Sequence, residues 1–172
     1  MLIRRIAAVA VGIVAAPVLA SCSFSIGGNS IDMDKLTSAI TDEFNSTLAP
    51  FGYRVQDVTC DDPGKDPGDG TEFNCVATAD GTAFNVTATV AQPDVNFKSV
   101  ERAYDMKTTS KKLAPAVSEK IGRPITVDCG SGLKAVAPQQ SFTCSVADSA
   151  GNTGTLTYHV TEAAEQDRWE VE

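Results

Sequence analysis

The amino-acid sequence predicts an α+β fold of two tandem units, each a helix packed on a three- or four-stranded antiparallel sheet and closed by one disulfide. Three observations lead to this prediction: a repeated cysteine spacing, two apolar stripes at helical period, and strand-like segments after each stripe. We expect a first unit over residues 32–97, a linker over 98–104 and a second unit over 105–172.

The cysteines repeat along the chain, which has 172 residues and five cysteines. Cys60 and Cys75 lie 15 positions apart, Cys129 and Cys144 have the same separation, and the second pair follows 69 positions after the first. Self-similarity at a fixed period predicts two copies of one structural unit. Apart from Cys22, which lies in the N-terminal segment, four cysteines remain, and four cysteines allow three pairings. Because both copies should carry the same bridge, we expect Cys60–Cys75 and Cys129–Cys144. A metal site is the alternative, but the close CxxC pairs and histidines of such sites are missing.

Each unit is expected to begin with an amphipathic helix. Asp32 is a typical N-cap residue, and Pro50, Gly52 and Gly122 should end the two helices. Pro115 interrupts the second copy, where it would either kink the helix or delay its start. Mostly apolar residues recur every three or four positions and so share one helical face: Met33, Leu36, Ile40, Phe44 and Leu48 in the first copy, and Met106, Thr109, Leu113, Val117 and Ile121 in the second.

Alternating apolar residues predict the strands that follow each helix. Segments 53–59 and 125–128 lead into the first cysteine of each copy, and Asp80-Gly81 is a typical hairpin turn. The side chains expected to face the core are Phe73, Cys75, Ala77, Ala79, Phe84, Val86, Ala88, Val90, Val95 and Phe97 in the first copy, and Phe142, Cys144, Val146, Leu156, Tyr158, Val160, Trp169 and Val171 in the second.

The N-terminal segment has the features of an export signal. Two arginines precede an apolar run over residues 6–20, which is shorter than the roughly 20 apolar residues of a membrane-spanning helix. The run closes with Leu19-Ala20-Ser21-Cys22, which resembles the lipobox of bacterial lipoproteins. The resemblance implies that residues 1–21 are a signal peptide, that Leu19, Ala20 and Ser21 are recognised by the signal peptidase, and that Cys22 carries lipid such as palmitate.

A lipidated Cys22 would anchor the chain at the outer face of the cytoplasmic membrane, within the cell envelope. Two or more acyl chains give stable attachment, where one gives only marginal binding. The residues that follow are small and polar, so segment 22–31 is expected to be a flexible tether. The alternatives are an ordinary signal peptide with a chance cysteine, and an uncleaved anchor helix.

The charge of the chain disfavours two classes of partner. The leader carries two of the 14 basic residues and none of the 22 acidic ones, so the chain after the cut has a net charge of −10. Such acidity disfavours nucleic acid and direct adhesion to anionic lipid headgroups.

The order of motifs resembles the actinobacterial lipoprotein domain of unknown function 4333. The shared features are a helix, a Val-x-Cys strand, a Phe-x-Cys strand, an Ala-Asp-Gly turn and a Thr-rich strand, seen here at Val58-Thr59-Cys60, Phe73-Asn74-Cys75 and Ala79-Asp80-Gly81. The resemblance covers residues 32–172 as a tandem pair. It implies the two disulfides and a cell-envelope setting, and it brings no catalytic residues.

No set of residues predicts a catalytic, metal or cofactor site. His159 is the only histidine, and we expect it on the solvent face of the last hairpin without a Ser or Asp companion. The loop Asp61–Gly70 holds four carboxylates, which is compatible with calcium. Its spacing lacks the alternating ligand register of an EF-hand, and its Pro and Gly residues are typical of a mobile connector.

The expected function is therefore that of a non-enzymatic envelope lipoprotein whose modules bind a protein or cell-wall partner. An inhibitor is the second hypothesis, because a secreted tandem of disulfide-bearing helix-and-sheet units is similar in architecture to the beta-lactamase inhibitory protein. An uncharacterised hydrolase is the third. A binding protein should expose an apolar patch, whereas an enzyme should hold a pocket with perturbed titratable groups.

Replacing Cys22 by alanine should abolish lipid attachment, because the thiol is the group that would accept the lipid. Metabolic labelling with an alkyne analogue of palmitate should mark the wild-type chain and the control Cys60→Ala, but not Cys22→Ala. Label retained on Cys22→Ala would contradict the lipobox assignment.

Overall fold

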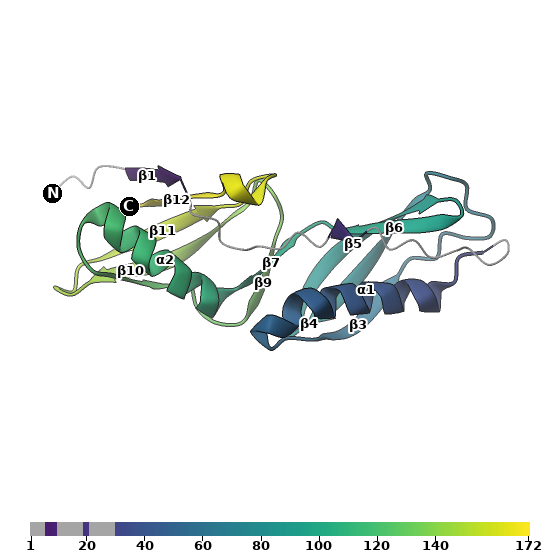
Figure 1. Cartoon of the computed structure of the whole chain (residues 1–172), viewed down its shortest axis with the longest axis horizontal. Helices are drawn as coiled ribbons and strands as arrows, with labels where there is room; N and C mark the ends of the chain where they lie inside the picture. The colour runs from purple at the N-terminus through teal and green to yellow at the C-terminus, as the bar shows by residue number, and fades with distance from the viewer. Residues whose placement is uncertain (1–5, 10–18, 21–29) are drawn as a thin grey trace. The chain divides into compact units, whose positions relative to one another are not determined.

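Each half of the chain places one long helix against one antiparallel sheet, which confirms the predicted α+β class (Figure 1). The computed structural model describes residues 6–9, 19–20 and 30–172. The chain divides into two units, a first within residues 16–102 and a second formed by residues 103–172 together with the segment 1–15. Among the described residues, no helix is both long and apolar enough to cross a membrane.

The first unit is a helix followed by a meander of strands. Helix α1 (Met33–Leu48) continues into a 3-10 turn, Ala49–Phe51. The strands are β3 (Val55–Cys60), β4 (Glu72–Ala79), β5 (Thr82–Ala91) and β6 (Asp94–Ser99). Neighbours along the chain pair in antiparallel fashion, and the short strand β2 (Leu19–Ala20) extends the sheet at β6, giving the order β2-β6-β5-β4-β3. The predicted turn at Asp80-Gly81 joins β4 to β5, with both residues at positive φ.

Local chemistry explains the position of α1. The Asp32 side chain accepts a hydrogen bond from the Lys35 N–H at 3.1 Å, which satisfies one of the free donors of the first turn. Gly52 adopts a φ of 86° after the 3-10 turn, a conformation that favours glycine. The helix buries four residues of its predicted stripe against the sheet: Leu36, Ile40, Phe44 and Leu48.

The second unit repeats this arrangement. Helix α2 (Met106–Ile121) is followed by β8 (Ile125–Asp128), β10 (Ser141–Asp148), β11 (Thr153–His159) and β12 (Arg168–Val171), with a 3-10 turn (η2, Ala164–Gln166) before β12. The short strand β1 (Ile6–Val9) pairs with β12, so the sheet order is β1-β12-β11-β10-β8. A separate two-stranded sheet joins β7 (Arg102–Asp105) to β9 (Leu133–Val136).

Helix α2 passes through Pro115. The helix begins at Met106, where the Asp105 side chain accepts a hydrogen bond from the Thr108 N–H at 2.8 Å, so a start delayed beyond Pro115 was a wrong alternative. Gly122, at a φ of 77°, ends the helix as predicted. Met106, Thr109, Leu113 and Val117 are buried on this helix. Such tertiary packing supplies most of the stability of helices in proteins, and a proline inside a helix removes one hydrogen bond.

The two units share a junction between helix and first strand. In the first unit, the Val55 N–H donates to Asn45 Oδ1 at 2.8 Å. In the second, the Ile125 N–H donates to Ser118 Oγ at 2.9 Å. Both acceptors lie 13 positions after the N-cap of their helix, Asp32 or Asp105. Different side chains therefore hold the same backbone geometry in the two units.

Three boundaries differ from the predictions. The segment 98–104, expected to be a linker, is largely strand, because β6 extends to Ser99 and β7 begins at Arg102. Ile31, expected in the tether, is 7% exposed and precedes the N-cap, where an apolar residue can pack on the first helical turn. Within the predicted leader, residues 6–9 and 19–20 pair with sheet edges. Ser21, Cys22 and tether residues 23–29 lie outside the described residues.

Both predicted disulfides are present. Cys60 and Cys75 are register partners on β3 and β4, with Cα atoms 3.9 Å apart. Cys129, directly after β8, bonds Cys144 on β10 with Cα atoms 4.0 Å apart. Each bridge joins the edge strand of the four-stranded meander to its neighbour.

Removing either bridge should destabilise its unit. Closure of a 15-residue loop is worth about 3 kcal/mol in the chain-entropy model, so Cys60→Ala/Cys75→Ala and Cys129→Ala/Cys144→Ala should each lower the free energy of unfolding by that amount. Denaturant titrations followed by circular dichroism measure the loss. Fluorescence of Trp169, the only tryptophan, reports on the second unit alone. A loss below about 1 kcal/mol in both variants would contradict the chain-entropy account.

Candidate functional site

The second unit contains an apolar pocket of about 260 Å³. It lies where α2 ends, between the last turn of that helix, the start of β8, the β10–β11 turn and the end of β12. Its apolar lining comes from Ile121, Ile125, Val146, Trp169 and Val171. Trp169 is only 3% exposed, so its ring belongs to the core as predicted while also lining the pocket.

Charged residues of both signs border the pocket. Its lining includes two cationic side chains and two side-chain carboxylates: Lys120, Arg123, Asp148 and Glu172. Arg123 Nη2 lies 3.3 Å from Asp148 Oδ2, with the arginine side chain 58% exposed and the aspartate side chain 4% exposed. The pocket therefore presents an apolar interior and a rim that carries charges of both signs.

Asp148 organises the turn that forms one wall. Its carboxylate accepts hydrogen bonds from the side chain and backbone N–H groups of Asn152, each at 2.9 Å, and from the Ala150 N–H at 2.9 Å. The Asn152 hydrogen bonds, together with the Ala150 N–H and the Arg123 charge, hold the pKa of Asp148 below its usual range. Asp148 is thus a fixed carboxylate of the β10–β11 turn.

Gly154 keeps the pocket free of a side chain on β11. A Cβ at this position would lie 2.6 Å from the Glu172 carbonyl oxygen and 3.3 Å from Val146 Cγ2. The close approach arises because Thr155 and Glu172 exchange backbone hydrogen bonds at 3.0 and 2.9 Å. Glycine is therefore required by the approach of the β12 end to β11.

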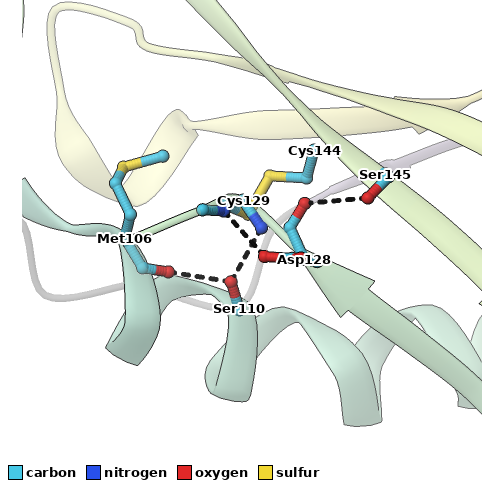
Figure 2. The surroundings of a disulfide bond; sticks show 7 residues. Met106, Ser110, Asp128, Cys129, Cys144 and Ser145 are labelled. Atoms are coloured by element: carbon cyan, nitrogen blue, oxygen red, sulfur yellow. Dashed lines mark hydrogen bonds between the residues drawn. A yellow bond between two sulfur atoms is a disulfide. The ribbon is translucent and has the colours of Figure 1, made fainter. Parts of the chain in front are cut away.

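The disulfide of this unit is held to α2 by a serine (Figure 2). Ser110 Oγ donates to the Met106 carbonyl at 2.8 Å and accepts from the Cys129 N–H at 2.9 Å. On the strand side, Ser145 Oγ donates to the Asp128 carbonyl at 3.3 Å. The Cys129–Cys144 bridge therefore lies where α2, β8 and β10 meet, which fits a structural role.

His159 lies on the face of β11 opposite to Tyr158 and Val160, as predicted. Its side chain is 30% exposed, and Nε2 lies 3.2 Å from Glu170 Oε1 on the neighbouring strand β12. The prediction missed this acidic partner because the pairing of β11 with β12 joins residues 11 positions apart. The pair stands on the outer face of the sheet and does not line the pocket.

The C-terminal half of the acidic loop 61–70 is hydrogen-bonded to the end of β5 and to the β5–β6 turn. Asp69 Oδ1 accepts from the Gln92 N–H at 3.0 Å, and the Gly70 N–H donates to the Val90 carbonyl at 2.8 Å. Pro67 is buried, and its carbonyl accepts from Gln92 Nε2 at 3.3 Å. This half of the loop is therefore not the mobile connector we expected. Among the described residues, no three His, Cys, Asp or Glu side chains gather into a possible metal site.

A buried carboxylate that the sequence did not reveal organises the end of the second unit. Asp167 is fully buried, and its Oδ2 accepts hydrogen bonds from the hydroxyls of Tyr104 and Tyr158, both at 3.1 Å. Its Oδ1 accepts from the Thr161 N–H at 2.8 Å. These donors come from β7, β11 and the following loop, so only the folded chain brings them together. Local sequence carries no signal for this network, because Asp167 follows a short polar turn.

Replacing Asp167 by alanine should lower the free energy of unfolding of the second unit by about 3 kcal/mol, because it leaves two buried tyrosine hydroxyls without this acceptor. The control Glu165→Ala, an exposed position in the same turn, should stay within about 0.5 kcal/mol of wild type. Denaturant titrations followed by Trp169 fluorescence provide the measurement. Equal stabilities of the two variants would contradict a structural role for Asp167.

Two residues of the predicted lipobox, Ser21 and Cys22, lie outside the described ranges. The other two, Leu19 and Ala20, form β2.

Comparison with curated proteins and with solved structures gives no match. Residues 17–95 match the family described as Domain of unknown function (DUF4333). The matched range lies within the first unit and covers less than half of the chain. The expected resemblance is confirmed over this range as a domain of unknown function 4333, and its tandem arrangement stays a prediction.

Proposed function

We propose that this protein is a lipid-anchored, non-enzymatic binding protein of the cell envelope, held at the outer face of the membrane by Cys22. The sequence Leu19-Ala20-Ser21-Cys22 supports the anchor, and the family match begins at residue 17 and so includes these residues. Two disulfides in two small units are typical of an oxidising, extracytoplasmic compartment. The second unit would then be a diverged copy of the matched first one.

One observation carries the binding role: the apolar pocket in the second unit. Concave apolar sites with a few polar groups at their edge are where proteins bind ligands and the anchoring residues of partners. Ile121, Val146 and Trp169 offer such a surface, and the Arg123–Asp148 pair borders it.

The titratable groups at this pocket favour binding over catalysis. A general acid or base works best with a pKa near the working pH. The pKa of Asp148 is instead shifted below its usual range, because its hydrogen bonds stabilise the charged form. The carboxylate therefore fits a structural role at the rim better than a role in proton transfer.

Cleavage before Cys22 would change the sheet edges. Both β1 and β2 belong to the proposed signal peptide, so their loss would leave β12 and β6 at the edges of two four-stranded sheets. The sheets would then match the three- or four-stranded sheets expected from the sequence. The disulfide edges, β3 and β8, are unaffected by the cut.

Capture from intact cells tests the proposal. Wild-type protein, expressed with its leader, is crosslinked in the envelope, purified in detergent and compared with Ile121→Phe, which should fill the pocket from its rim. Leu133→Phe adds the same ring to a partly buried site outside the pocket and is the matched control. We expect a specific envelope partner with wild type and Leu133→Phe, and at least a fivefold lower yield with Ile121→Phe. Recovery of no specific partner with wild type would contradict the binding role.

A further inference from the structure

We propose that the pocket of the second unit receives one aromatic side chain of a partner polypeptide, beside the glycine that replaces a core phenylalanine of the first unit. The inference rests on the proposed binding function and names the chemistry that the pocket selects.

Strand registers define the equivalent positions. Cys75 on β4 faces Val86 on β5, and Cys144 on β10 faces Leu156 on β11. Two residues earlier along the second strand of each pair stand Phe84 and Gly154. Their own partners correspond as well, because Phe84 faces Ala77 and Gly154 faces Val146. Gly154 therefore occupies the position of Phe84.

The helices differ at the matching point. Phe44 and Val117 each lie 12 positions after the N-cap of their helix. In the first unit the rings of Phe44 and Phe84 pack edge to face, with centroids 5.5 Å apart and exposures of 1% and 0%. The second unit has a valine and a glycine instead of these two rings. The apolar pocket borders Gly154, the register counterpart of Phe84.

The second unit places its aromatic volume further along the sheet. Ala88 faces Phe73 in the first unit, whereas its counterpart Tyr158 faces Phe142 in the second. The Tyr158 and Phe142 rings stack at 5.0 Å, and Tyr104 lies 5.3 Å from Phe142. These rings complete that part of the core and do not line the pocket. The space beside Gly154 is therefore left for a group from outside the unit.

Size and surroundings favour a single ring on a polypeptide. A volume of about 260 Å³ exceeds the roughly 150 Å³ of an apolar cavity that binds benzene, and it falls below the roughly 300–1,000 Å³ of pockets for complete small-molecule ligands. The chain cannot fill the space from position 154, because a Cβ there meets the Glu172 carbonyl. A rim with both charges suits a peptide flanked by polar groups, whereas a rim of one sign would select an ionic ligand.

Trp169 provides the readout, because it is the only tryptophan and lines the pocket. The full chain, reconstituted in phosphatidylethanolamine–phosphatidylglycerol vesicles, is titrated with N-acetyl-L-phenylalaninamide, N-acetyl-L-alaninamide, toluene and sodium octanoate. We expect a saturable change in emission with the phenylalanine amide, at a Kd in the millimolar range, and none with the alanine amide. Toluene should bind at least threefold more weakly than the phenylalanine amide, because it lacks the peptide groups that meet the rim.

Two variants fill the pocket independently, so that failure of one to fold leaves the other. Ile121→Phe and Val146→Phe should each weaken binding of the phenylalanine amide at least tenfold, and Leu133→Phe should leave it unchanged. Tighter binding of octanoate would identify an acyl-chain site, and toluene equal to or tighter than the amide would identify a site for free aromatic molecules; either overturns the inference. So does a wild-type protein without a saturable response. Partner capture that Ile121→Phe reduces, combined with no ring binding, would refute this inference while leaving the binding function supported.

Discussion

A single sixteen-residue helix covers one face of each sheet, and the rest of each unit depends on this packing. The helix contributes one stripe of about four buried side chains, so the strand residues opposite must supply the remaining volume of the core. In the first unit, Phe84 does so by packing against Phe44. Protein interiors contain few voids. Replacing one large side chain beneath such a helix by a small one therefore leaves a cavity, unless another side chain fills the space.

The two units show which features of this arrangement can vary. Both helices start with an aspartate cap, and in both a polar helix side chain accepts the backbone N–H of the following strand, Asn45 in one and Ser118 in the other. Both bridges join the edge strand to its neighbour. These polar and covalent contacts fix the backbone, since buried backbone donors need partners. The apolar volume between helix and sheet is free to shift, and it has moved from Phe84 in one unit to Tyr158 in the other.

The two units therefore share one architecture but differ in how the space between helix and sheet is filled. The first has a filled core and the family match, and its acidic loop is attached to the β5–β6 turn. The second leaves an apolar pocket beside Gly154 and maintains its fold with other contacts, including the buried hydrogen bonds of Asp167 and the serine attachment of its disulfide. The network around Asp167 supports the sheet beside β12, whose Trp169 lines the pocket.

Local periodicity and the repeat were sufficient to predict the α+β class, the helix caps and ends, most core-facing residues and the cysteine pairing. Asp32 and Gly122 act through neighbours three or four residues away. The repeat paired Cys60 with Cys75 and Cys129 with Cys144. The sequence also supplied the lipobox resemblance at Cys22, which remains a prediction. The folded structure was needed to reveal the β7–β9 pairing, the contacts of Asp167 and His159, the attachment of the acidic loop and the pocket. Each of these features depends on residues that are distant in sequence and come into contact only in the folded chain. The pocket volume likewise depends on how the helix and the strands pack together, so no single segment predicts it.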